Sequence, residues 1–95
     1  MNLLQTLDQR AKPRLQSGFR LQWEPQQNHH VLLFPEGMVK LNGSASEILK
    51  RCTGDATVAE ITAQIEQAFG RVNLGSEVAN FIGHAVERQW LTLSP

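Results

Sequence analysis

A chain of 95 residues with 41% hydrophobic and 19% charged side chains has the length and composition of one small soluble domain. Its nine basic residues balance nine acidic ones, which disfavours a nucleic-acid-binding role because such domains usually carry a basic excess. The single cysteine, Cys52, excludes an internal disulfide and a cysteine-based metal cluster. No segment has the roughly 20 apolar residues of a membrane span, and Met1–Leu4 does not resemble a signal peptide. We therefore expect a cytoplasmic protein.

The N-terminal segment has a short helical pattern. Leu3, Leu4, Leu7 and Ala11 follow helical spacing, and Pro13 interrupts it. Isolated helices shorter than about 12 residues are marginal in water. We expect residues 1–12 to form an arm that is either flexible or docked, for example on a second copy of the chain, and residues 13–95 to form one domain.

The next segments predict an antiparallel sheet. Phe19–Trp23 alternates apolar and polar residues, as a half-buried strand does. His30–Phe34 and Met38–Leu41 are apolar runs, and Pro35–Gly37 between them has the residues of a tight turn. Three strands joined by short links indicate a meander with two edges.

Three helices are predicted after the sheet. Ser44 with Glu47, and Thr57 with Glu60, have the spacing of capping boxes, and Gly54 and Gly70 are typical helix stops. The third helix is expected over about 74–89. The apolar residues at three-and-four spacing are Ala45, Ile48, Leu49 and Cys52 in the first helix, Val58, Ile61, Ile65 and Phe69 in the second, and Val78, Phe81, Ile82, Ala85 and Val86 in the third.

The remaining segment, Trp90–Leu93, is expected to be a final short strand or an extended tail. The predicted fold class is α+β: a three-stranded antiparallel sheet followed by three helices, in a winged-helix-like arrangement.

The sequence contains no catalytic constellation. His29 and His30 are adjacent in a strand, so their side chains point to opposite faces and do not suit one metal ion. Cys52 lies on the apolar face of a predicted helix, where a thiol behaves as a small hydrophobe. We expect a protein without enzymatic activity, metal or cofactor.

Two non-catalytic functions fit the pattern. A winged-helix domain would bind DNA through its third helix, but the exposed residues of that helix include Glu77, Glu87 and only one arginine, Arg88. Alternatively, a sheet edge accepts an extended peptide as an added strand, with an apolar helix as the second wall. Lys40 also suits an edge that is protected against strand pairing. Pattern alone does not separate these functions.

Several segments resemble the PqqD family. The most specific are Leu32–Asn42, LLFPEGMVKLN, and Ser44-Ala45 after it. Phe19–Glu24, Thr57–Ile61 and Trp90-Leu91 continue the match, so that the resemblance covers about residues 13–93. The chain departs from the family pattern with Thr53 after the cysteine and Gln89 before the tryptophan.

The resemblance implies a peptide chaperone of pyrroloquinoline quinone (PQQ) biosynthesis. Such proteins bind the ribosomally made precursor peptide PqqA and present it to the radical S-adenosylmethionine enzyme PqqE. The guest peptide would pair with the third strand and lie against the third helix. The peptide-binding residues that this implies are Gly37, Met38, Val39, Lys40 and Leu41 in the strand, and Val78, Ile82, Ala85 and Val86 in the helix. Some of the helix residues must instead face the core. The chain is expected to be a monomer or an exchanged homodimer, with no nucleic-acid or membrane partner.

Overall fold

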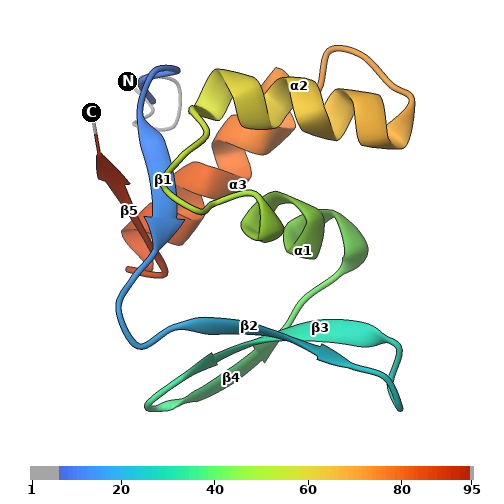
Figure 1. Cartoon of the computed structure of the whole chain (residues 1–95), viewed down its shortest axis with the longest axis vertical. Coiled ribbons are helices and arrows are strands. Elements are labelled where there is room, and N and C mark those ends of the chain that lie inside the picture. Colours follow the sequence, from blue (N-terminus) through green and yellow to red (C-terminus); the bar gives the residue numbers. More distant parts are fainter. Residues whose placement is uncertain (1–6, 95) are drawn as a thin grey trace.

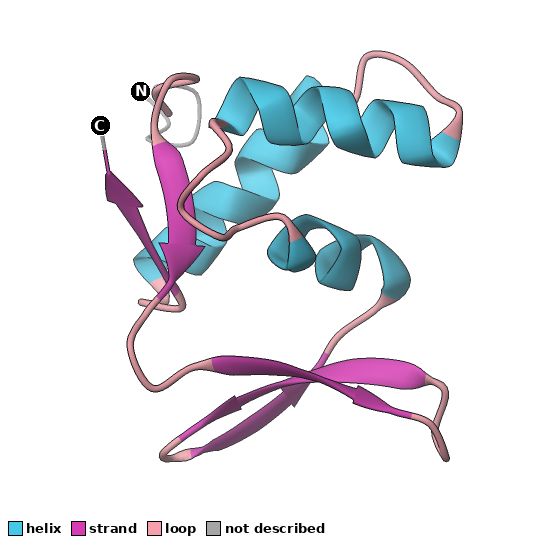
Figure 2. Ribbon diagram, in the orientation of Figure 1, coloured by secondary structure: helices cyan, strands magenta, loops and turns pink. Residues whose placement is uncertain are grey.

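The computed structural model describes residues 7–94 as one small sheet covered by helices, with a two-strand ribbon beside them (Figures 1 and 2). In chain order the elements are β1 (Lys12–Leu15), β2 (Arg20–Glu24), β3 (His29–Phe34), β4 (Gly37–Lys40), α1 (Gly43–Lys50), α2 (Val58–Phe69), α3 (Gly75–Glu87) and β5 (Leu91–Ser94). The predicted α+β class is confirmed.

Strands β2, β3 and β4 form an antiparallel sheet in that order, which confirms the predicted meander. Trp23 lies opposite His30, and Leu32 lies opposite Val39. The β3–β4 turn centres on Pro35 and Glu36, and Gly37 follows with a φ of +155° that other residues rarely adopt. Leu32 is fully buried, so this register turns one face of the sheet toward the helices.

A second, two-stranded ribbon was not predicted as such. β1 pairs antiparallel with β5, with Lys12 opposite Ser94 and Leu15 opposite Leu91. Of the two alternatives for the C-terminal segment, the strand is therefore correct. Pro13 lies within β1, which pairs with only one named strand, and proline is tolerated in such edge positions.

The helical pattern of the N-terminal arm lies partly outside the described residues, which begin at Leu7. Within them, Leu7 and Ala11 are not helical. The carbonyl oxygen of Ala11 instead accepts a hydrogen bond from the Val58 amide at 2.9 Å, and that of Gln9 accepts one from Ala59 at 3.0 Å. These contacts dock residues 9–11 on the first turn of α2. The boundary at residue 12 stays a prediction.

One of the two predicted capping boxes forms. The Thr57 hydroxyl accepts from the Glu60 amide at 3.1 Å, and the Glu60 carboxylate accepts from the Thr57 amide at 2.8 Å. At α1 the prediction of a Ser44 cap is wrong, because the cap is Asn42, whose side-chain oxygen accepts from the Ala45 amide at 2.8 Å. Gly70 ends α2 in the left-handed conformation, with a φ of 64°.

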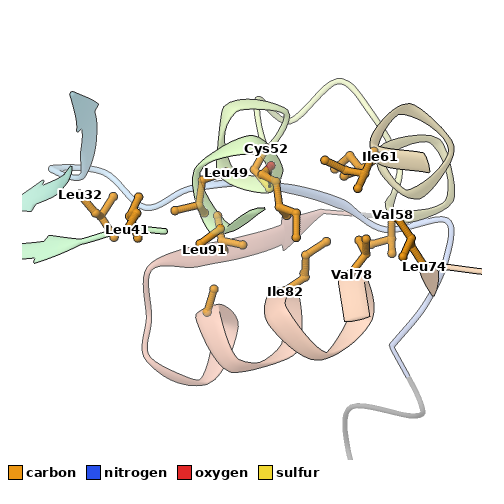
Figure 3. Close-up of a cluster of buried hydrophobic side chains, with 14 residues drawn as sticks. Leu32, Leu41, Leu49, Cys52, Val58, Ile61, Leu74, Val78, Ile82 and Leu91 are labelled. Atoms are coloured by element: carbon orange, nitrogen blue, oxygen red, sulfur yellow. Dashed lines mark hydrogen bonds between the residues drawn. The ribbon is translucent and has the colours of Figure 1, made fainter. Parts of the chain in front are cut away.

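The core lies between the three helices and the inner face of the sheet (Figure 3). It consists of Leu32, Leu41, Ala45, Ile48, Leu49, Cys52, Val58, Ile61, Ile65, Leu74, Val78, Ile82, Ala85 and Leu91. Phe69, predicted to continue the inner face of α2, is instead 40% exposed. Within the described part of the chain, no helix is long and apolar enough to cross a membrane.

Candidate peptide-binding site

Strand β4 is an edge of the sheet, because among the described strands it pairs only with β3. The Leu41 amide donates to the His30 carbonyl at 3.0 Å, directly after β4 ends. Hydrogen-bonded and non-hydrogen-bonded pairs alternate along an antiparallel ladder. Val39 therefore also directs its backbone groups toward β3, whereas Met38 and Lys40 direct theirs away from it. The free N–H and C=O groups of this edge belong to Met38 and Lys40.

A groove of about 320 Å³ lies beside the second half of β4. One wall comes from β4 and the start of α1, and the other from the C-terminal half of α3 and the residues that follow it. The lining residues are Val39, Lys40, Leu41, Asn42, Ala45, Phe81, His84, Ala85, Arg88 and Trp90. A free strand edge thus borders a groove whose opposite wall is a helix.

The helix wall combines apolar and basic groups. The partly buried rings of Phe81 and Trp90 supply most of its apolar surface, and Ala85 between them is 1% exposed. The Arg88 guanidinium carbon lies 5.6 Å from the Trp90 ring centroid, within cation–π range. His84 Nδ1 lies 3.9 Å from Glu87 Oε2 on the exposed side of the helix. The wall can therefore contact both apolar and acidic side chains.

Only some of the residues predicted for the helix wall line this groove. Ala85 does, although it is only 1% exposed and also belongs to the core. Val78 and Ile82, 1% and 0% exposed, are not among the lining residues and point into the core (Figure 3). Val86 is partly buried and packs against the same core. On the strand side, Val39, Lys40 and Leu41 line the groove. Val78 and Ile82 are therefore among the helix residues that face the core, and of the four predicted helix residues Ala85 lines the groove.

Sequence reasoning missed six residues of the groove, which are Asn42, Ala45, Phe81, His84, Arg88 and Trp90. Phe81, His84 and Arg88 follow one another at spacings of three and four, so they share one face of α3. That spacing is visible in the sequence, but Phe81 also fits the apolar stripe of the core and Arg88 also fits the exposed face of the helix. Arg88 and Trp90 lie two residues apart just after α3, and a guanidinium within about 6 Å of a ring centroid is attracted to the face of the ring.

A larger cleft of about 530 Å³ shares Leu41 and Asn42 with the groove. It is flanked by the half-exposed rings of Trp23 and Phe69. Its strand residues are His29 and His30 of β3, which is paired on both sides, and Trp23 of β2. None of its lining residues belongs to β4, so this cleft does not adjoin the free edge of that strand.

The other candidate residues have structural partners. His29 makes contacts of 2.7 Å from Nε2 to Gln27 Oε1 and 3.0 Å from Nδ1 to the His30 carbonyl oxygen. The His30 ring meets Trp23 edge-on, with 4.9 Å between centroids. Burial raises the pKa of the Cys52 thiol to about 12, which makes it a poor nucleophile.

The fold, a three-stranded sheet followed by three helices with a groove between an edge strand and the last helix, is that of a recognition element for ribosomally made peptides. A solved structure of that class matches it with a TM-score of 0.63 at 31% identity, covering 87% of this chain and 88% of the other. That structure is the PqqD truncation of PqqCD from Methylobacterium extorquens, described as a functional, stand-alone recognition element of ribosomally synthesised and post-translationally modified peptides.

The chain belongs to the PqqD family. The model of that family, described as coenzyme PQQ synthesis protein D, matches residues 29–91. A "PqqA binding protein" of Azotobacter vinelandii is 49% identical over 82 residues, which cover 85% of this chain and 89% of the relative. One of Pseudomonas fluorescens Pf-5 is 40% identical over 90 residues, covering 94% and 99%. The family predicted from the sequence is confirmed.

Proposed function

We propose that this protein binds the precursor peptide PqqA as an added strand on β4 and presents it to the enzyme PqqE during PQQ biosynthesis. The names of the relatives support PqqA as the guest. In this role the domain performs no chemistry of its own and supplies only recognition. The presentation to PqqE rests on the family resemblance. The cytoplasmic location rests on the composition of the sequence, and a monomer or an exchanged homodimer are both proposed because sheet edges and loosely packed arms permit exchange.

The observation that carries the proposal is the juxtaposition of a free strand edge and a helix-walled groove. Met38 and Lys40 offer unpaired backbone groups, and the groove beside them begins at Val39. In strand addition, the edge supplies backbone hydrogen bonds and the adjoining pocket receives alternate side chains of the guest. Both components include residues of β4.

The energetics require both components. Two N–H and two C=O groups allow four hydrogen bonds, which at a net value of about 1 kcal/mol each contribute roughly 4 kcal/mol. Association costs several kcal/mol in translational freedom and in ordering the peptide. The apolar contacts of the guest with Phe81, Ala85 and Trp90 must therefore supply much of the affinity.

A titration of isotope-labelled protein with synthetic PqqA tests the proposal. We expect the amide resonances of Met38 and Lys40 to move most in β4, together with those of Phe81 to Arg88. Shifts concentrated around Trp23 and Phe69 would move the site to the larger cleft and overturn the strand-addition geometry.

The absence of shifts at a large peptide excess, repeated with PqqE present, would overturn PqqA binding itself. A parallel titration with duplex DNA addresses the winged-helix alternative. Binding that falls steeply with salt and moves the exposed face of α3 would favour that alternative.

A further inference from the structure

Two basic residues of the groove have no acidic partner within residues 7–94. Lys40 and Arg88 line the groove from opposite walls, and its lining contains no aspartate or glutamate. Neither forms an ion pair, whereas Lys50 and Arg51 both pair with Glu47, at 2.7 and 2.9 Å. Arg88 thus gives the groove wall a positive charge, and Lys40 gives one to the adjoining strand edge, in a chain whose formal net charge is zero.

The register of β4 determines where a guest would meet these charges. Side chains alternate between the two faces of a strand. Val39 and Leu41 face the helices together with their cross-strand neighbours, and Lys40 faces the opposite side of the sheet. A guest residue opposite Lys40 therefore projects beside the Lys40 side chain, and the guest residues before and after it project toward α3.

Resting on the proposed strand addition, we infer that the groove selects a guest segment with the pattern apolar–acidic–apolar, whose carboxylate pairs with Lys40. Cross-strand pairs of opposite charge are favourable, and like pairs are not. The flanking apolar side chains enter the groove between Phe81, Ala85 and Trp90. Arg88, held over the Trp90 ring, adds a second positive charge at the helix wall. Backbone pairing alone would accept any extended peptide segment, and the apolar–acidic–apolar requirement selects among such segments.

A double-mutant cycle tests this inference. In the synthetic PqqA peptide, each aspartate and glutamate is replaced in turn by its amide, and each peptide is titrated into the wild-type protein and into Lys40→Met. Lys40 is exposed, so the folded state should tolerate this change. We expect one amide peptide to bind wild type roughly three- to tenfold more weakly, and the same replacement to have no effect in Lys40→Met.

A matched variant controls for net charge. Lys40→Met/Arg88→Gln and Lys50→Met/Arg71→Gln each remove two positive charges, but the second pair lies outside the groove lining. We expect Lys40→Met/Arg88→Gln to bind PqqA more weakly than wild type and with less dependence on salt. Lys50→Met/Arg71→Gln should keep the wild-type affinity and salt dependence. Amide shifts at Met38 and Lys40 with equal affinity for all amide peptides would overturn the inference and leave strand addition intact. If those amides do not shift, strand addition itself fails, and the inference fails with it.

Discussion

The amide of Leu41 donates to the carbonyl oxygen of His30 at 3.0 Å, and this bond determines which groups of β4 face a guest. Because bonded pairs alternate, Val39 pairs with Leu32 toward the inside of the sheet. The Val39 amide therefore cannot donate to a guest strand, so a proline that tests the edge belongs at the neighbouring Met38.

Met38→Pro should weaken PqqA binding at least tenfold. Proline removes an outward N–H donor, and its ring obstructs a strand that approaches from that side. Edge strands accept proline where the lost amide faced solvent, so the free energy of unfolding should change by less than about 1 kcal/mol. Calorimetric titration and denaturant unfolding measure the two quantities.

Val39→Pro is the matched control for Met38→Pro. It removes a ladder bond and leaves the Leu32 carbonyl unpaired, which should reduce stability by about 1–3 kcal/mol. Unchanged PqqA affinity in a folded Met38→Pro protein would rule out this edge as the docking site.

Phe81→Ala should reduce PqqA affinity by roughly tenfold, because the ring forms part of the apolar helix wall. Phe69→Ala is the control, since it removes the same ring from α2, where it lines the larger cleft. Both rings are partly exposed, so both variants should fold. Equal losses of affinity in the two variants, or a loss only in Phe69→Ala, would contradict the assigned groove.

Asn42→Ala should lower the free energy of unfolding by about 1 kcal/mol, because it removes the side-chain cap of α1. For a domain of this size, that corresponds to a fall in melting temperature of roughly 4–8 °C. Ser44→Ala should change stability little, because the Ser44 hydroxyl only donates to Asn42 Oδ1. Thermal unfolding of both variants compares them directly, and a larger loss in Ser44→Ala would restore the cap predicted from spacing.

These caps show what local spacing can determine. Thr57 and Glu60 formed the predicted box, whereas Ser44 and Glu47 have the same spacing and did not. Asn42 begins the helix two residues earlier, and Glu47 is drawn to Lys50 and Arg51 on the next turn. A spacing rule identifies a helix start, but competing partners decide which residue caps it.

The sheet order and the family were predictable because both depend on contiguous segments. The pairing of β1 with β5 joins residues about 80 apart, such as Lys12 and Ser94, and no local pattern reports it. The groove also depends on residues far apart in the sequence. Helix α3 carries two apolar stripes, and only the packed fold shows that Ile82 faces the core and Phe81 faces β4.

Stability should fall with decreasing pH partly through Glu47. Side-chain hydrogen bonds from Lys50 and then Arg51 hold the pKa of this carboxyl below its ordinary value of 4.5. A lowered folded-state pKa contributes stability above the unfolded pKa, and that contribution disappears as pH falls through the folded pKa. The unfolding free energy of wild type should therefore decline more steeply below about pH 4.5 than that of Glu47→Gln. If the unfolding free energies of wild type and Glu47→Gln fall in parallel with pH, the Glu47 carboxylate does not contribute to the pH dependence of stability.

Cys52 should react with iodoacetamide only when the protein opens. Its thiol is 3% exposed, and burial raises its pKa from 9.0 to about 12, which lowers the thiolate fraction at pH 8 by roughly a thousandfold. Alkylation should therefore be fast in denaturant and slow in the folded protein. Because Cys52 lies in the core formed by all three helices, the slow rate should follow global unfolding.

Adding PqqA tests whether Cys52 reacts through global unfolding. A ligand that binds only the folded state reduces the open population by the factor 1 + [L]/Kd, so PqqA at 100 times its Kd should slow alkylation about a hundredfold. Phe81→Ala, with its weakened groove, should lose most of this protection at the same peptide concentration, and Phe69→Ala should keep it. Alkylation at a rate independent of peptide would show that Cys52 is exposed by a local opening around the C-terminal end of α1 that leaves the groove intact.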